Sequence, residues 1–472
     1  MDFMSSLPDS LLILILSYLT FYDAWKTSEL GLRYRHLWIS TANFEFDEEF
    51  FVNSGVRHDI DQGIDRPPAE IRAEARATFM RFLRNFFSRH QGRFAFFRLR
   101  LSNPEEFERE VREWLEAIVR FNAESVDLCF SDWWRADNDS EAYAFRFELP
   151  DRFYRGDSIT SLSLAGTKFD AESFRGFQNL VVLNIGKISL SKEDIQGILL
   201  AVPTLRDLTL YKCMSDGFVM ENLKKAAPIT SLKVEEFWPL SEGITLQMPK
   251  LRSFKYTGWL RQLVFMDMNS IEDVELDFCL EYEFDEIGDI LQEMLVGLGR
   301  VKSLIVCSYL AQTISSGDEP LHLWAIQDDL RQLTMNISCH QYELPGISFM
   351  LRSYRNLEKF TIQICEERVL EDFEYPFAQV QIGRAFWNMQ AIAPVACLRR
   401  TLKMVEVVGF KGTENELELL RYLLREGVVL HRVIIKTFAQ PVDGNLNQIM
   451  VAAEQALNFP RGSANVEVTI VA

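Results

Sequence analysis

The sequence predicts an α/β fold: a short N-terminal three-helix module, an irregular solenoid of parallel strands with helices on its convex side, and a C-terminal cap. Three observations predict it. Consecutive apolar residues stand near the N-terminus, a short apolar phrase recurs about every 20–30 residues from Phe94 onward, and an amphipathic pattern at 414–425 precedes a last apolar strand pattern. The predicted boundaries are 1–51, 52–92 for a linker and helix, 93–396 for the solenoid, and 397–472.

Length and charge narrow the possible functions. The 472 residues exceed one ordinary core, which indicates two or three domains or one extended repeat array. There are 50 Lys and Arg against 68 Asp and Glu, a formal net charge of −18. Such a surface repels phosphate backbones and anionic lipid, so we expect neither nucleic acid nor a membrane as partner. Seven cysteines without a C-x-x-C pair predict reduced thiols and a nuclear or cytoplasmic location.

The apolar run from Leu11 to Leu16 has three possible explanations: a signal peptide, a membrane anchor, or a helix that docks on another protein. A signal peptide needs a basic start, but the charges before the run are Asp2 and Asp9. A membrane span needs roughly 20 apolar residues, and the segment Ser10–Leu19 is about half of that. The sequence therefore favours the docking helix.

Three short helices are expected in the first forty residues. Pro8 and Asp9 are typical of a helix start, with Asp9 or Ser10 as cap. The positions with helical spacing on one apolar face are Leu11, Leu12, Ile15, Leu16 and Leu19. A second helix is expected at 24–30 with Asp23 as cap, and a third at 33–38. The apolar face either contacts a partner or packs on the rest of the chain, and the pattern leaves both alternatives open.

These residues resemble the plant F-box pattern L-P-D…I-L-S-x-L…D-A…T-S-x-L…R-W-R-x-L-W. The matching positions are Leu7, Pro8, Asp9, Ile15, Leu16, Ser17, Leu19, Asp23, Ala24, Thr27, Ser28, Leu30, Arg33, Arg35, Leu37 and Trp38, and residues 43–50 resemble the family's exit segment. The resemblance implies docking to the Skp-type adaptor of a cullin-based ubiquitin ligase. The implied adaptor-binding residues are Leu7, Pro8, Asp9, Leu12, Ile15, Leu16, Leu19 and Trp38. Thr20, Leu32 and Tyr34 depart from the pattern, and Thr20 is expected to weaken the end of the first helix.

Residues 52–70 are rich in turn formers and contain Pro67-Pro68, which predicts a boundary between the module and the body. Amphipathic helices are expected at 71–89 and 107–121. Their Phe-rich faces favour a structural core over a ligand site.

The phrase apolar-x-x-apolar-x-apolar occurs thirteen times in order, and each copy predicts one strand whose alternate side chains point inward. The copies begin at Phe94, Ala123, Ile159, Leu180, Leu205, Ile229, Leu251, Ile271, Val301, Leu330, Leu357, Leu402 and Leu430. This spacing is typical of leucine-rich repeats. Cys213, Cys279 and Cys365 follow three phrases at the position where such repeats carry Asn or Cys, so we expect structural thiols there. A convex helix is expected within 280–300 and a loop at 315–320.

Two further segments resemble plant F-box proteins. Residues 147–169 are similar to a repeat segment of that family. Residues 397–437 resemble its C-terminal FBD region, through Cys397-Leu398, Val405-Glu406, 409–412, Glu416 and the helix at 417–425, and 459–468 resemble its closing P-R-x-S segment and final strand. The region is expected to cover the open edge of the solenoid.

The sequence contains no pattern for catalysis or for a cofactor. The six histidines are scattered, and nucleophile-elbow, P-loop and dinucleotide motifs are absent. Cys397, near Arg399 and Arg400, is the nearest candidate for a reactive thiol, but the FBD resemblance already explains it. We therefore expect a non-enzyme without metal or cofactor.

Without chemistry of its own, the chain is expected to position a target protein. The predicted substrate-binding residues lie on the solvent side of successive strands: Thr209, Tyr211, Lys233, Glu235, Lys255, Thr257 and Glu275, with Asp277 beside them. Lys233 and Lys255 predict a small basic spot that could bind an acidic or phosphorylated segment, or they are ordinary solvated lysines. The function hypotheses are a ligase substrate receptor, a non-ligase scaffold or decoy, and a small-molecule co-receptor.

Overall fold

The computed structural model describes residues 6–51, 69–90, 92–131, 147–221, 228–260, 263–279, 287–314, 329–365, 384–437 and 446–471. The predicted linker at 52–68 and the loop at 315–320 lie outside these residues. The chain forms two compact units. Unit 1 comprises Met1–Phe218, Leu223–Ile229 and Phe237–Leu240, and unit 2 comprises Val219–Asn222, Thr230–Glu236 and Ser241–Ala472.

Unit 1 begins with the predicted helical module. It contains α1 (Asp9–Leu16), α2 (Phe21–Lys26) and the 3-10 helices η2 (Thr27–Glu29) and η3 (Tyr34–Ser40). Pro8 precedes α1, but no side chain caps that helix; the Asp9 carboxylate instead pairs with Arg33 at 2.7 Å. The cap of α2 is Thr20, whose Oγ1 accepts from the Asp23 N–H, and not Asp23 as predicted. Thr20, which departs from the F-box pattern after the first helix, therefore serves as the cap of the second helix.

The sheet of unit 1 contains six parallel strands in chain order. They are β1 (Asn43–Asp47), β2 (Phe96–Arg100), β3 (Ser125–Cys129), β4 (Ser161–Ala165), β5 (Val182–Gly186) and β6 (Asp207–Tyr211). Phe44, Phe97 and Val126 occupy equivalent register positions and are buried. The segment predicted as the F-box exit is thus the first strand of the repeat sheet, because its alternating Phe44 and Phe46 fit the core of β2.

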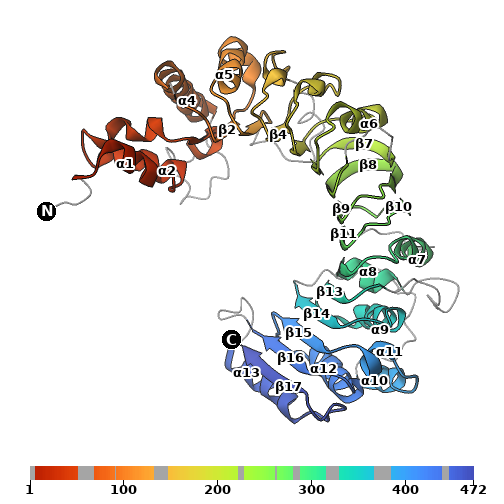
Figure 1. Ribbon diagram of the computed structural model, residues 1–472. Helices are drawn as coiled ribbons and strands as arrows, with labels where there is room; N and C mark the ends of the chain where they lie inside the picture. Colours follow the sequence, from red (N-terminus) through yellow and green to blue (C-terminus); the bar gives the residue numbers. More distant parts are fainter. Residues whose placement is uncertain are drawn as a thin grey trace. The chain divides into compact units, whose positions relative to one another are not determined.

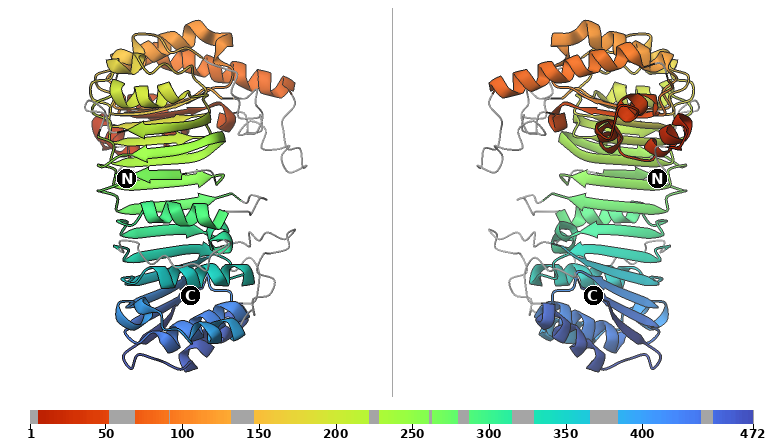
Figure 2. Two further views of the ribbon diagram at one scale, coloured as in Figure 1. Left: turned by 90° about the vertical axis from the view of Figure 1, so that its right-hand side faces the viewer. Right: turned by 90° about the vertical axis from the view of Figure 1, so that its left-hand side faces the viewer.

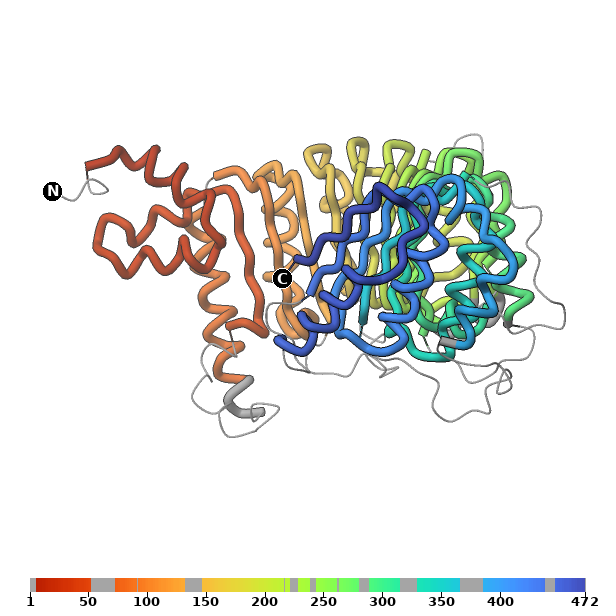
Figure 3. The backbone as a smooth tube through the Cα atoms, turned by 90° about the horizontal axis from the view of Figure 1, so that it is seen from below, coloured from red at the N-terminus to blue at the C-terminus, as the bar shows by residue number. Residues whose placement is uncertain are grey.

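Helices and 3-10 turns cover one side of this sheet. They are α4 (Ala69–Arg89), η5 (Pro104–Phe107), α5 (Glu108–Arg120), η7 (Phe153–Arg155), η8 (Ser173–Gly176) and α6 (Lys192–Ala201). Figure 1 shows α5 and α6 on one side of the strands, and in Figure 3 the successive turns of the chain in unit 1 lie side by side. We call the opposite side of each sheet the open face. Side chains alternate between the buried core and this open face, as in a leucine-rich repeat.

Unit 2 contains a second run of parallel strands. They are β9 (Ser253–Gly258), β11 (Asp273–Phe278), β12 (Ser303–Cys307), β13 (Gln332–Ile337), β14 (Lys359–Ile364), β15 (Met404–Val408), β16 (Arg432–Lys436) and β17 (Glu467–Val471). Figure 2 shows them, in green to blue, side by side. The chain also forms β7 (Met214–Glu221), β8 (Ser231–Gln247) and β10 (Leu263–Met266), and β10 pairs in parallel with the end of β8.

The helices of unit 2 are α7 (Ile287–Gly297), α8 (Ser308–Thr313), α9 (Leu344–Ser353), α10 (Arg384–Gln390), α11 (Ala396–Arg400), α12 (Glu414–Glu426) and α13 (Leu446–Gln455), with η9 (Gln341–Glu343) and η10 (Ala456–Asn458). Helix α7 lies within the predicted convex segment, and α12 matches the predicted C-terminal helix to within a residue.

All thirteen apolar phrases form strands, and each strand begins two residues after the start of its phrase. The C-terminal region belongs to the same sheet. Strands β15, β16 and β17 continue the register of β14 residue by residue, with Phe360, Val405, Val433 and Val468 in one row. The region thus adds further repeats, because its strands carry the same alternating apolar pattern as the others.

Candidate functional site

Helix α1 is apolar on all sides, and the chain covers one of them. Leu12 is 1% exposed and Leu16 is also buried, packed within the module that contains the buried Ala24 and Leu37. A short helix with apolar residues all round has more apolar surface than one small core can cover. A second apolar side of α1 therefore remains outside the module.

This second side and the turn that follows α1 form an exposed apolar surface, which we call the α1 surface: Leu11, Leu14, Ile15, Tyr18 and Leu19. Leu14 is 52% exposed and Tyr18 is 82% exposed. Single exposed apolar residues are normal, but a contiguous group on one helix is typical of a protein-binding site. Leu30 and Leu32, in the turn before η3, are exposed as well.

The structure divides the eight predicted adaptor-binding residues. Pro8, Asp9, Ile15 and Leu19 are exposed, and Leu7 is half-buried. Leu12, Leu16 and Trp38 are buried in the chain's own core, so in this conformation they offer no surface to a partner. Sequence reasoning overlooked Leu14 and Tyr18. The six consecutive apolar residues were the signal, since such a run cannot all face one side of a helix.

Trp38 joins the module to the body. Its indole stacks on Phe82 and Phe86 of α4, with ring centroids 5.9 and 6.2 Å apart, and Phe21 of α2 meets it edge-on at 5.8 Å. The indole N–H donates to the Arg35 carbonyl. The apolar area that this ring buries is why the small module is ordered against the repeats.

Arg33 connects the L-P-D motif to the turn before η3. Its guanidinium pairs with Asp9 at 2.7 Å and donates to the Leu7 carbonyl. The motif thus fixes the start of α1 by an ion pair with a residue 24 positions away, and not by a helix cap.

On the open face of unit 1, the predicted residues Thr209 and Tyr211 are half-buried. Tyr211 lies flat against the neighbouring strand, since a Cβ atom on Gly186 would approach its Cζ to 2.0 Å. Burial raises the pKa of the Tyr211 hydroxyl well above its usual range. The ring of Tyr211 is therefore partly a packing element.

On the open face of unit 2, the predicted basic spot is wrong. Lys255 Nζ lies 3.7 Å from a Glu235 carboxylate oxygen and 3.2 Å from one of Glu275. Burial lowers the pKa of Lys255, but the interactions with these carboxylates outweigh burial and raise the pKa above its usual value. Lys233 is exposed and Thr257 and Asp277 are half-buried on the same face. The local charge is negative, because each side of Lys255 holds a glutamate.

Paired charges recur across both open faces. In unit 1, Arg98 lies between Glu45 at 3.1 Å and Asp127 at 2.7 Å. In unit 2, Glu406 lies between Lys359 at 2.9 Å and Lys436 at 2.6 Å. These residues share one register position or neighbouring ones on adjacent strands, so side-by-side strands neutralise each other's charges.

The described thiols are not arranged for chemistry. Cys397 is buried and its Sγ donates to the Leu351 carbonyl at 3.1 Å. Cys213 is a buried packing residue, and burial raises its pKa to about 12, while Cys279 and Cys365 are half-buried. Among the residues that the structure describes, no group of three His, Cys, Asp or Glu side chains could hold a metal ion.

Comparison with known proteins identifies the family. The family described as "At1g61320/AtMIF1, LRR domain" matches residues 88–458, more than three quarters of the chain. The chain belongs to this leucine-rich-repeat family.

Its similar proteins in Arabidopsis thaliana are F-box proteins. The F-box protein At3g62230 is 29% identical over 481 residues, which cover 99% of this chain and 98% of the relative. The F-box/FBD/LRR-repeat protein At1g78750 is 20% identical, over 92% of this chain and 89% of its own length, and the F-box/FBD/LRR-repeat protein At1g13570 is 21% identical, over 99% and 97%. The resemblance to plant F-box proteins with leucine-rich repeats is thereby confirmed. In the described part of this F-box/LRR chain, no helix has the length and apolarity to cross a membrane.

Proposed function

We propose that this F-box/LRR protein is the substrate-recognition subunit of a Skp–cullin–F-box ubiquitin ligase and has no catalytic activity of its own. The observation that supports the proposal is the α1 surface. Its five apolar side chains are 38% to 82% exposed, although α1 belongs to a module whose other side is well packed. A Skp-type adaptor that covered this surface would remove a large apolar area from water.

In this function the chain raises the rate of ubiquitin transfer only by holding the target protein close to the ubiquitin-charged enzyme. The F-box module holds the adaptor, and the open faces of the repeats hold the target protein. The target's lysines and the ubiquitin-charged enzyme then share one complex, so their effective concentration is far above the bulk value.

The adaptor interaction is tested by changing Leu11→Asp and Leu14→Asp together in the full chain. Both side chains are about half exposed, so the substitutions leave the core intact. Desolvating two carboxylates against an apolar partner should weaken adaptor binding by roughly 100-fold or more, measured by calorimetry or pull-down.

A matched control is Leu200→Asp on α6, an exposed leucine of similar accessibility outside the module. It should leave adaptor binding unchanged. Wild-type chain that fails to bind any Skp-type adaptor would favour a non-ligase scaffold. Binding that survives the double substitution would show that the α1 surface is not the contact.

The target can be sought through the same variant. Proteins that accumulate when the wild-type chain is replaced by the Leu11→Asp, Leu14→Asp variant are candidates, because that variant keeps its open faces and loses the adaptor. Candidates that still bind the variant directly, and that lose ubiquitin conjugates in its presence, would fit a target. An unchanged proteome would contradict the substrate-receptor function.

A further inference from the structure

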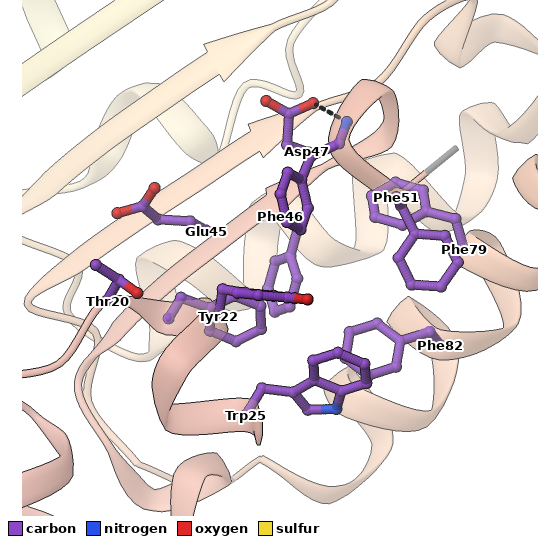
Figure 4. A pocket seen from close by; sticks show the side chains of 11 residues that line it. Thr20, Tyr22, Trp25, Glu45, Phe46, Asp47, Phe51, Phe79 and Phe82 are labelled. Atoms are coloured by element: carbon purple, nitrogen blue, oxygen red, sulfur yellow. Dashed lines mark hydrogen bonds between the residues drawn. The ribbon is translucent and has the colours of Figure 1, made fainter. Parts of the chain in front are cut away.

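A cavity of about 450 Å³ lies where α2, β1 and α4 meet in unit 1. Aromatic side chains make most of its wall: Tyr22 and Trp25 from α2, Phe46 from β1, Phe51, and Phe79 and Phe82 from α4. Figure 4 shows the lining side chains, with Phe51 next to Phe79. The volume suits a small organic group.

The aromatic wall is fixed by contacts among its own rings. Phe51 lies 5.4 Å from Phe79 and 6.2 Å from Phe82, between ring centroids, and Phe46 lies 6.0 Å from Phe82. Trp38 stacks on Phe82. Because Phe46, Phe51, Phe79 and Phe82 are held by one another, this part of the cavity wall is preformed.

The charged side chains that line the cavity are Glu45 and Asp47, both from β1. Each has an arginine neighbour on β2: Arg98 at 3.1 Å from Glu45, and Arg100 at 3.4 Å from Asp47. Arg98 is shared with Asp127 at 2.7 Å. Glu49 adds another carboxyl close by, and burial and the Asp47 charge raise its pKa. The two lining carboxylates are thus held in ion pairs by β2, and they are the charged groups that the cavity wall presents to a ligand.

The chain itself already contains a cation over one of these rings. Lys26 Nζ lies 4.2 Å from the centroid of the Tyr22 ring. The negative face of an aromatic ring attracts ammonium and guanidinium groups within about 6 Å, most strongly where water is excluded. Tyr22 is therefore placed where a cation can approach it.

We propose that this cavity binds an organic cation, an alkylammonium or guanidinium group on an apolar body. The body would contact the rings of Trp25, Phe79 and Phe82, and the charge would lie toward Glu45 and Asp47. A cation would add a further favourable interaction with these carboxylates, which a neutral apolar ligand cannot make, and an anion would be repelled. The group could belong to a free small molecule or to a methylated lysine or arginine of a peptide. This site is independent of the proposed adaptor function.

The test measures the binding of choline to the full-length chain by saturation-transfer NMR. The comparison ligand is 3,3-dimethyl-1-butanol, the neutral isostere in which carbon replaces the ammonium nitrogen. We expect choline to bind at least about 10-fold more tightly than the isostere. A peptide with trimethyllysine, compared with its unmodified form, distinguishes a peptide source from a free metabolite.

Two variants test the two parts of the site. Trp25→Leu keeps an apolar wall but removes a ring, and Glu45→Gln keeps the rim's shape but removes a charge. Each should weaken cation binding by about 5-fold or more, and Glu45→Gln should do so without changing the binding of the neutral isostere. The matched controls are Trp259→Leu, an exposed tryptophan of unit 2, and Glu193→Gln at the start of α6, and both should bind cations like the wild type.

Equal binding of choline and its isostere, no cation binding up to about 10 mM, or full binding by both cavity variants would each overturn the proposal. Circular dichroism checks that the variants are folded, and Glu45→Gln, a surface change, keeps the test valid should Trp25→Leu unfold. The Leu11→Asp, Leu14→Asp variant should still bind the cation, so failure of adaptor docking and failure of this site are separable.

Discussion

Trp38 has a different role from the one that its motif suggests. The F-box resemblance implies an adaptor contact, whereas the ring is buried against Phe82 and Phe86 of α4. The sequence showed a tryptophan at this position of the motif. It did not show which way the side chain points, because the ring packs on a helix more than thirty residues further along the chain. The same holds for Leu12 and Leu16, since an all-apolar helix does not itself select the side that packs.

Trp38→Ala should destabilise unit 1 by about 3–5 kcal/mol, because it removes a large buried ring and leaves a cavity. The free energy of unfolding in urea measures the effect. Tyr18→Ala, at an 82% exposed position in the turn after α1, is the control and should change stability by less than about 0.5 kcal/mol. Equal effects of the two substitutions would contradict the buried position of Trp38.

Glu406 should make the stability of unit 2 depend on pH. Hydrogen bonds and charges of Lys436 and Lys359 lower the pKa of Glu406 below its ordinary 4.5. A carboxyl with a lowered pKa in the folded state stabilises above its unfolded pKa, and this contribution is lost as the pH falls below about 4.5. Glu406→Gln should therefore cost about 1 kcal/mol at pH 7, and the difference from wild type should shrink as the pH falls toward 3.

Denaturation midpoints across that pH range measure the difference. Glu467→Gln is the control, because Glu467 is exposed and its partner Arg432 is 4.0 Å away. A difference between wild type and Glu406→Gln that stays constant with pH would mean that the Lys–Glu–Lys row contributes nothing electrostatic.

Strands were the most predictable elements, and the reason is their period. An apolar residue at every second position indicates a strand with one buried face. Thirteen copies of the same phrase in order strengthened the prediction for each one. Strand β1 was missed because Thr41 stands two residues before it, where each phrase has its first apolar residue. The aromatic cavity was not predictable, since its rings come from α2, β1 and α4 and meet only in the folded chain.

Gly186 on β5 and Tyr211 on β6 should be coupled. A methyl group at Gly186 would overlap the Tyr211 ring, so Gly186→Ala should destabilise unit 1 by about 1–3 kcal/mol. In the Tyr211→Ala background the same substitution should cost much less, because the ring is no longer there. A double-mutant cycle of unfolding free energies gives the coupling, and purely additive effects would refute the contact.

The whole molecule consists of two units, each with its own buried core. The length predicted a multidomain protein or a repeat array, but the boundary inside the run of repeats was not visible, because the phrases on either side are alike. Stability in repeat arrays is largely local, since each repeat contacts mainly its neighbours.

A destabilising substitution in one unit should therefore leave the strands of the other unit stable. Trp38→Ala should raise amide hydrogen exchange in β1 to β6 and leave β12 to β17 protected, whereas Leu423→Ala in α12 should do the reverse. Exchange followed by mass spectrometry reads both regions in one experiment. A uniform rise over all strands after either substitution would indicate a single cooperative unit.

The half of α1 that its own module leaves uncovered also has a practical consequence. Two copies of the chain could cover these residues by packing helix against helix, so the isolated protein should self-associate as its concentration rises. Sedimentation velocity should show this association, and producing the chain together with a Skp-type adaptor should suppress it. A higher yield of purified chain in the presence of the adaptor would then indicate that the adaptor covers these residues.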